Sequence, residues 1–501
     1  MQHLRRSILV PRPLFALLVA ASAAGCAAES PDAWEESDTL QIGSTSEALS
    51  AGDVDLIAIG SLDASGRDRS AQTGAALENG RPGNLLGGMG SGLAYAGGST
   101  FLAVPDRGPN AVAYNSLVDD TTSFIDRFHT LHLRLAPSAA GAALPFVLSS
   151  QLRSTTLFHS RSPLLYGDGV AAGLPSGAPA LNKQNKFYFV GRSDNFDPTQ
   201  PSTSSADARL DPESIRVSND GESVYISDEY GPFVYEFERG SGRRTRAFEL
   251  PASFAISALS SQGDAEIAGN ASGRVTNKGM EGLAITPDGE TLIGAMQSPL
   301  LQDGATNGRF TRLVSIAVGS GETREFAYEL TNIGSASKPK FPTVSDIVAI
   351  NDHELLVDER DGKGLGDGST AVFKRIYRID LAGATDVSGL SGEAALAGHA
   401  VTKTLFLDVV ATFNAHGIAS NDIPAKLEGL AFGPDVVIDG GVQHTLFLTN
   451  DNDFIATVID ANHPAGIANP NQFFVFKVAS SALPTFVAQD LSDGEDSDQD
   501  E

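Results

Sequence analysis

The sequence from Lys278 to Gln297, KGMEGLAITPDGETLIGAMQ, has the pattern of two short strands joined by a tight turn. A Glu-Gly pair precedes an apolar run, Pro-Asp-Gly supplies the turn, and a second apolar run follows. Three more stretches share this pattern: DPESIRVSNDGESVYISDEYGP from Asp211, TVSDIVAINDHELLVDERDG from Thr343, and KLEGLAFGPD from Lys426 with HTLFLTNDND from His444. A recurring hairpin of this kind predicts an array of equivalent β-units.

The spacing of the units predicts a β-propeller. The acidic residues that begin them are about 65 to 82 residues apart: Glu213, Glu281, Asp346 and Glu428. That length holds four short strands with their loops, which is one propeller blade. A degenerate copy, MGSGLAYAGGSTFLAVPDRGP, begins at Met89 with Ser91-Gly92 in place of Glu-Gly.

The gap from Gly92 to Glu213 is about twice the repeat, so a further blade is expected there. It would carry RFHTLHLRL from Arg127 and LPFVLSSQL from Leu144. We therefore predict an all-β fold, a β-propeller of six blades with seven as the alternative, over residues 51–485. The early strand VDLIAIGSL, from Val54, is expected to pair with the late FFVFKV, from Phe473, and so leave no free sheet edge.

Composition narrows the class of protein. The chain has 501 residues with 52 Gly and 25 Pro, which suits many turns between strands. A formal net charge of −27 argues against nucleic acid or an anionic membrane surface as partner, since both would repel it. The sequence contains neither the G-x-S-x-G nucleophile elbow nor the H-E-x-x-H zinc motif.

Both ends of the chain differ from the repeat region. Residues 1–26 have a basic start, an apolar stretch and small residues before Cys26, as in an export signal with a lipidation site; ordinary signal cleavage with an incidental Cys26 is the alternative. Residues 27–50 are expected to form a flexible tether, and residues 486–501 an acidic disordered tail. We expect an exported monomer, either a lipoprotein of the outer membrane or cell envelope or a secreted protein, touching the membrane only through its lipid anchor.

The acids of the repeats are expected to meet at one rim of the propeller. One set lies at or just before the innermost strand of each blade, and the other follows the next strand. Because a hairpin returns to the edge where it began, the two sets would converge. Two unit charges about 4 Å apart repel by roughly 4 kcal/mol at an effective dielectric of 20, so such a rim needs a cation, protons or interleaved Arg and Lys. Oxygen ligands without Cys or paired His favour Ca²⁺, with Mg²⁺ as the alternative.

The four ordered motifs, from DPESI to LFLTNDND, resemble the phytase-like family, described as "esterase-like activity of phytase", over roughly residues 85–460. The resemblance implies a propeller, a location outside the cytoplasm and hydrolysis of phosphate or other esters with calcium. In that interpretation a small-molecule phosphate ester or other anionic ligand binds at the rim. The expected catalytic residues are Glu213, Asp228, Glu229, Glu281, Arg360 and Glu428. The expected substrate-binding residues are Arg107, Lys278 and Arg360. The expected metal ligands are Asp228, Glu229, Glu281, Glu359, Asp361, Asp451 and Asp453.

Two functions remain open from sequence. One is a calcium-dependent phosphoesterase, which predicts a deep acidic pocket with unpaired carboxylates. The other is a non-catalytic propeller that binds a ligand or partner protein, which predicts carboxylates already satisfied by backbone N–H groups and arginines.

Overall fold

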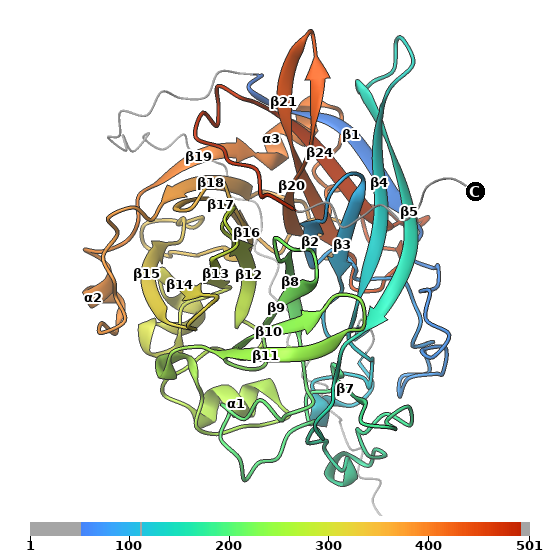
Figure 1. The fold of residues 1–501 in the computed structure, drawn as a ribbon, viewed down its shortest axis with the longest axis vertical. Coiled ribbons are helices and arrows are strands. Elements are labelled where there is room, and N and C mark those ends of the chain that lie inside the picture. The colour runs from blue at the N-terminus through green and yellow to red at the C-terminus, as the bar shows by residue number, and fades with distance from the viewer. Residues whose placement is uncertain (1–51, 111–112, 492–501) are drawn as a thin grey trace, which may run out of the picture. The chain divides into compact units, whose positions relative to one another are not determined.

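A computed structural model describes residues 52–110 and 113–491, and these form a β-propeller of five blades (Figure 1). The inner strands contact one another in a closed ring: β2 (Gly92–Tyr95), β8 (Pro212–Val217), β12 (Met280–Ile285), β16 (Thr343–Ala349) and β20 (Lys426–Ile438). The export signal, Cys26, the tether of residues 27–50 and residues 492–501 of the expected tail lie outside the described residues. In the part of the chain that the structure describes, no helix has the length and apolar character of a membrane span.

Each blade is an antiparallel sheet of four strands with the inner strand first. Blade 1 continues through β3 (Thr100–Val104), β4 (Arg127–Pro137) and β5 (Phe146–Leu157). Blade 2 continues through β9 (Ser223–Asp228), β10 (Phe233–Glu238) and β11 (Arg243–Glu249), and its outer edge adds β6 (His159–Ser160) and β7 (Phe187–Tyr188). Blade 3 continues through β13 (Thr291–Met296), β14 (Phe310–Ala317) and β15 (Thr323–Glu329).

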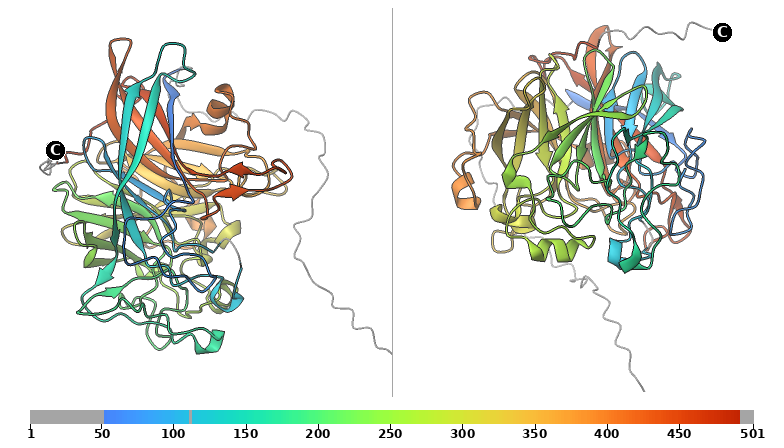
Figure 2. Two further views of the ribbon diagram at one scale, coloured as in Figure 1. Left: turned by 90° about the vertical axis from the view of Figure 1, so that its right-hand side faces the viewer. Right: turned by 60° about the horizontal axis from the view of Figure 1, so that its bottom comes forward.

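Blade 4 continues through β17 (Glu354–Arg360), β18 (Lys374–Asp380) and β19 (Lys403–Asp408), and blade 5 through β21 (Gly441–Asp451), β24 (Asn471–Ala479) and β1 (Val54–Leu62). A small hairpin, β22 (Thr457–Val458) and β23 (Ile467–Ala468), precedes β24. Three short helices lie outside the sheets: α1 (Gly263–Gly269), α2 (Glu393–Leu396) and α3 (Val409–Ala415). The long hairpins β4–β5 and β20–β21 project on the same side of the domain (Figure 2).

The propeller prediction is confirmed, but the predicted number of six or seven blades is wrong. The stretches RFHTLHLRL and LPFVLSSQL do not form a blade of their own: they are β4 and β5, the outer half of blade 1. The extra length before Glu213 consists instead of long loops that contain only β6 and β7. The predicted ring closure is confirmed, since β1 pairs with β24 from Val54–Val478 to Leu62–Asn471.

The predicted hairpins are present, and their turns have the expected chemistry. Gly221 and Gly289 have φ of 71° and 76°, a region that glycine enters without strain. The side chains of Asp220 and Asp288 accept hydrogen bonds from the backbone N–H two residues on, at 3.0 and 2.9 Å. These turns set the register that faces apolar side chains toward neighbouring blades.

The apolar core is divided among the spaces between successive blades. One cluster joins blades 5 and 1, for example, through Ile57, Leu93 and Phe447, and another joins blades 3 and 4 through Leu313 and Ile347. Blade sheets are therefore buried on both faces, so their strands are near-continuous apolar runs rather than alternating ones.

Small residues let the inner strands approach closely around the axis. A Cβ on Gly92 would lie 2.7 Å from the Cα of Ser214, and one on Gly282 would lie 3.0 Å from the Cα of Asp346. A Cβ on Gly429 would lie 2.9 Å from the backbone nitrogen of Leu93. These three glycines and Ser214 occupy equivalent positions on four inner strands. They surround the side chain of Asp346, which occupies that position on the fifth.

Asp346 and Arg216 form a buried ion pair on the axis that contacts all five blades. The Asp346 carboxylate accepts hydrogen bonds from Arg216 Nη2 at 2.9 Å, from Ser214 Oγ at 2.9 Å, and from the backbone N–H groups of Leu283 and Leu430 at 3.2 and 2.9 Å. The Arg216 guanidinium also donates to three backbone carbonyls of other blades: those of Leu93, Ile347 and Leu430. This pair closes the channel and crosslinks the blades.

The end of the described chain covers the opposite mouth of the channel. Phe486 packs against Phe432 of blade 5 with ring centroids 4.5 Å apart, and the Val487 N–H donates to Ile350 of blade 4 at 2.9 Å. The Gln489 amide donates to the Val217 carbonyl of blade 2 at 2.8 Å. Residues 486–491, expected from sequence to begin a disordered tail, therefore pack on the propeller.

We expect Asp346→Asn to lower the free energy of unfolding by about 3–5 kcal/mol, because it leaves the buried Arg216 charge uncompensated. Urea unfolding followed by circular dichroism measures the change. Ser345→Ala is the matched control. The Ser345 hydroxyl, next to Asp346 in the chain, is buried without a hydrogen-bond partner among the described residues, so its loss should change stability little. Equal stability of Asp346→Asn and the native chain would contradict the role of the axial pair.

A second buried carboxyl, Asp358 in β17, has no hydrogen-bond partner among the described residues on either oxygen. Burial raises its pKa to about 8, although Arg360 and Lys374 partly oppose the shift. Because this pKa lies above the unfolded value near 4, the folded state holds a proton between about pH 4 and pH 8 that the unfolded state has lost. The free energy of unfolding therefore falls as the pH rises through this window.

Asp358→Asn should remove that pH dependence and stabilise the fold at pH 8 by roughly 5 kcal/mol, with little effect at pH 4. Thermal unfolding across this range tests it. The control is Asp352→Asn, which removes an exposed charge from the turn of the same blade. Destabilisation by Asp358→Asn to the same extent at every pH would mean that the carboxyl has an ordinary pKa and a structural partner.

Candidate functional site

A cavity of about 640 Å³ opens at the end of the propeller where the inner strands begin. Its floor is formed by side chains at the start of the inner strands and its walls by the loops that follow the second strands. Its charged lining residues are Asp106, Arg107, Glu213, Glu229, Lys278, Glu281, Lys340, Arg360, Asp361, Lys363, Asp367, Lys426, Glu428 and Asp451. The rim predicted from the repeat is therefore a real concave site that mixes both signs of charge.

Equivalent positions of three blades place Glu213, Glu281 and Glu428 at this cavity. In blade 4 the equivalent position is Ser345, and Asp346 is one residue further along the strand. That single shift turns Asp346 toward the axis, where it pairs with Arg216. Asp346 therefore belongs to the structural core, whereas the three glutamates remain at the cavity.

Asp211, Glu213 and Glu229 form one acidic group, with a carboxylate oxygen of each within 4.8 Å of the others. Arg107, which follows β3, donates to Asp211 from Nη1 at 2.6 Å and lies 3.8 Å from Glu229 Oε2. Glu229 Oε1 is buried and has no partner among the described residues. Burial, and next the charge of Glu281, raise the pKa of both Glu213 and Glu229 well above the usual value. The group thus holds more negative charge than its one arginine offsets.

Glu281, Arg360 and Glu428 form the adjacent part of the floor. The Arg360 guanidinium donates to Glu428 and lies 3.8 Å from Glu281 Oε1, while Glu281 Oε2 is buried without a partner in the described chain. Burial, and next the charge of Glu428, raise the pKa of Glu281 to about 7, against the effect of Arg360. Lys278 donates to the Gln297 side chain at 2.8 Å. A carboxyl that titrates near neutrality thus lies beside fixed cations.

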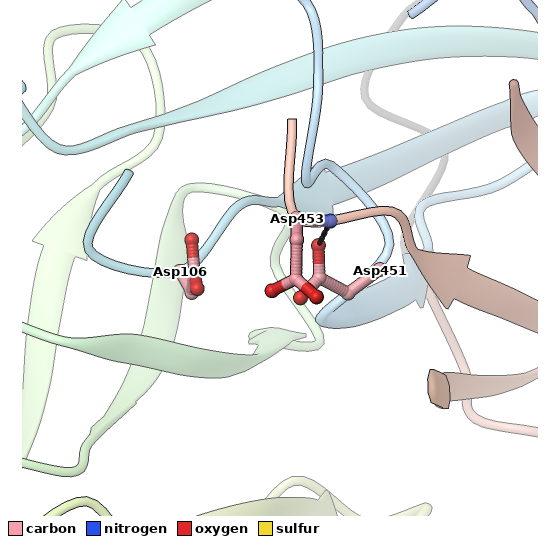
Figure 3. Close-up of side chains that lie close together, drawn as sticks. All are labelled: Asp106, Asp451 and Asp453. Atoms are coloured by element: carbon pink, nitrogen blue, oxygen red, sulfur yellow. Dashed lines mark hydrogen bonds between the residues drawn. The ribbon is translucent and has the colours of Figure 1, made fainter. Parts of the chain in front are cut away.

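A third acidic group already contains its own cation. Asp106, Asp451 and Asp453 lie close together (Figure 3), and Lys426 Nζ lies 2.7 Å from Asp451 and 2.5 Å from Asp453. The backbone N–H of Asp453 donates to Asp451 at 2.7 Å. Burial raises the pKa of Asp106 to about 7, although Lys426 opposes the shift. Asp451 and Asp453, expected to be metal ligands, are therefore ion-paired with a lysine.

Three other expected site residues have structural partners. Asp228 accepts backbone hydrogen bonds from Asp211, Tyr230 and Gly231 at 3.0–3.1 Å, so it holds the turn after β9 and does not line the cavity.

Glu359 lies between blades 3 and 4, where it accepts from Tyr328 Oη at 2.6 Å and from Lys403. Asp361 lines the cavity, but it accepts backbone hydrogen bonds from Val372 and Phe373 and contacts Lys374 Nζ at 3.2 Å. These contacts give Asp228, Glu359 and Asp361 structural roles, and not the metal-binding role expected from the sequence.

Two side chains at the site were not expected from sequence. Asp211 is the first residue of the repeat DPESIRV and holds Arg107 in place, and Gln297 ends another repeat and receives Lys278. Their signal was position: Asp211 lies two residues before Glu213, and Gln297 follows a second strand as Glu229 does. An aspartate or a glutamine at these positions gives no signal by itself. The position becomes informative once the strand ends are known to converge.

Comparisons with known proteins identify a family. The phytase-like family, described as "esterase-like activity of phytase", matches residues 84–454. An uncharacterised secreted protein of Arthroderma benhamiae is 36% identical over 138 residues, a match that covers 24% of this chain and 26% of that protein.

Among solved structures, a putative 6-phosphogluconolactonase from Bacteroides uniformis is 11% identical with a TM-score of 0.27, covering 77% of this chain and 88% of its own. A gluconolactonase from Xanthomonas campestris is 10% identical with a TM-score of 0.28, covering 85% of this chain and 97% of its own. Such distant likenesses carry no argument about activity. The family match, by contrast, spans most of the chain and includes every glutamate of the cavity floor, and by it this protein belongs to the phytase-like family.

Proposed function

We propose that this protein hydrolyses phosphate esters of small molecules at the channel mouth. The observation that carries the proposal is the pair of buried carboxylate oxygens, Glu229 Oε1 and Glu281 Oε2, that line a cavity without a partner in the described chain. A carboxylate ring that only fastened the blades would be satisfied, as Asp346 and Glu359 are. Unpaired buried carboxylates are costly, and at a cavity they are candidates for binding a cation or transferring a proton; Asp358 also lacks partners among the described residues but does not line the cavity.

Glu213 and Glu229 are the residues best suited to hold a divalent cation. Their oxygens are near one another, and the free Glu229 oxygen and their raised pKa values both indicate missing positive charge. Ca²⁺ or Mg²⁺ is the kind of ion that such an all-oxygen donor set prefers. A divalent cation bound there would neutralise phosphoryl charge and make a bound water more acidic.

The remaining groups are arranged for an anionic ester. Arg107, Lys278 and Arg360 line the cavity, and each keeps N–H donors beyond those used by its carboxylate or amide partner. They would bind the phosphoryl oxygens, as arginine and lysine do in other phosphate sites. Glu281, with a pKa of about 7, is suited to accept a proton near neutral pH.

In the proposed step, a water oxygen attacks phosphorus while Glu281 takes one proton of that water. The bond between phosphorus and the alcohol oxygen breaks, and the alcohol oxygen takes a proton from solvent water. One water is consumed, and one phosphate and one alcohol are released. Glu281 then returns its proton to solvent, which its near-neutral pKa permits.

A non-catalytic module that binds an anionic ligand is the second candidate. It is favoured by the number of acids with structural partners, since Asp228, Glu359 and Asp361 all have them. Such a module would use the same three cations without turnover. The experiment below separates the two.

We also propose export to the cell envelope. The basic, apolar and small-residue pattern of residues 1–26 supports it, as does the name of the secreted fungal relative for the quarter of the chain that it matches. Anchoring through Cys26 would leave the propeller outside the cytoplasm, where calcium is abundant.

Hydrolysis of phosphomonoesters and phosphodiesters by the full-length chain, with Ca²⁺ and then with chelator, tests the function. We expect turnover that the chelator abolishes, and Glu281→Gln should lower kcat by about 10²–10⁴ because it removes the proton acceptor while keeping the side-chain shape. Release of phosphate or alcohol gives the rate, and the melting temperature shows that the fold is intact.

The matched control is Glu290→Gln, an exposed glutamate in the turn of the same β12–β13 hairpin, which should keep full activity. Glu213→Gln should weaken the apparent affinity for Ca²⁺. Binding of inorganic phosphate without turnover of any ester would favour the binding module. Turnover that neither chelator nor Glu281→Gln reduces would place the chemistry elsewhere.

A further inference from the structure

The cavity has one apolar wall. Ile333, Pro339, Phe341 and Pro342 line it, and all four come from the loop between β15 and β16. Ile333 keeps 36% of its surface exposed, although it is a large aliphatic side chain. A polar substrate surrounded by hydroxyl or phosphate groups would gain nothing from such a surface.

The loop is held in place by its own hydrogen bonds. Asn332 Oδ1 accepts from the backbone N–H groups of Gly334 and Lys340 at 2.9 and 3.1 Å, and the Ile333 N–H donates to Lys340 O at 2.8 Å. Pro339 and Pro342 flank Lys340 and Phe341 and restrict their backbone. The apolar wall therefore exists before any ligand arrives, which lowers the cost of binding.

One end of the loop is joined to the structural residue Glu359 and the other to residues of the site. At its start, the Thr331 N–H donates to Glu359 at 3.1 Å. At its end, Thr343 pairs with Arg360, and the Val344 N–H donates to Gln297 O at 3.1 Å. Gln297 in turn receives Lys278. The loop that carries the apolar wall is therefore joined to Arg360 directly and to Lys278 through Gln297.

From this juxtaposition we propose that the site takes an amphipathic anionic ester. The anionic group lies on Lys278 and Arg360, and an apolar alkyl group of the alcohol portion lies on Ile333 and Phe341. The inference rests on the proposed function for its hydrolysis step, in which water attacks phosphorus and an alkyl alcohol is the leaving group. It predicts discrimination against esters of polyhydroxylated alcohols.

Hexyl phosphate and glycerol 3-phosphate form a matched pair of substrates, since both are primary alkyl monoesters but only one has an apolar chain. We expect kcat/KM for hexyl phosphate to exceed that for glycerol 3-phosphate by at least about tenfold, from burial of two or more methylene groups. The Ile333→Ser and Phe341→Ser double variant should reduce this ratio to near one, because it removes the apolar surface that the hexyl chain contacts. Val372→Ser, which changes an exposed apolar residue outside the cavity, is the control.

Calorimetry with hexylphosphonate and methylphosphonate, which cannot be hydrolysed, separates the two proposals. Preferred binding of hexylphosphonate that the double variant abolishes, without turnover of any ester, would support the apolar wall and overturn the enzyme. Turnover with a preference for glycerol 3-phosphate or inositol hexakisphosphate would support the enzyme and overturn the amphipathic substrate. Neither turnover nor preferred binding would overturn both. If the double variant melts early, Ile333→Ser alone gives the same comparison at an exposed position.

Discussion

The whole propeller depends on one buried ion pair at its axis. Five inner strands that meet around a channel leave backbone N–H and C=O groups facing one another across its axis. Arg216 and Asp346 fill that space and supply donors and acceptors to neighbouring strands in every direction. A buried pair of this kind adds little net stability over an apolar filling, but removing one partner is very unfavourable. The pair therefore determines the arrangement of the blades more than the net stability of the fold.

The same pair separates the two ends of the channel. On one side lie the acids and cations of the cavity; on the other, residues 486–491 cover a mouth lined by Leu93, Val217 and Phe432. Because the axis is blocked, a ligand that enters the charged cavity must leave by the same opening. The charged cavity is thereby separated from the pocket of about 500 Å³ at the opposite end.

Sequence repeats predicted the propeller class because each hairpin carries its own turn signal. They failed on blade number because length alone cannot tell a blade from long loops: residues 158–210 contain many polar and Gly-rich turns but only two short strands. The structure brings Glu213, Glu229, Glu281, Arg360 and Glu428 together at one cavity, and the catalytic and metal roles expected of them stay predictions.

The prediction was incomplete for the role of each acid. Glu229 and Asp228 are adjacent, yet one faces the cavity and the other holds a turn. Glu359 and Arg360 point to opposite sides of β17, toward blade 3 and toward Glu428. Strand periodicity predicts such alternation, but which face meets which neighbour depends on the ring. The role of each acid depends on its partners and on whether it lines the cavity, and residue type alone predicts neither.

Closure of the ring by β1 and β24 has a consequence for how the chain reaches its native state. The paired residues are separated by roughly 400 positions, so the first strand of the domain has no partner until nearly all of the chain has been made. At a synthesis rate of about 5–20 residues per second, that wait is about 20 to 80 s. Throughout it, β1 is an unpaired, apolar edge open to aggregation or to chaperones. A protein built this way suits a route on which the chain is kept unfolded until it is complete.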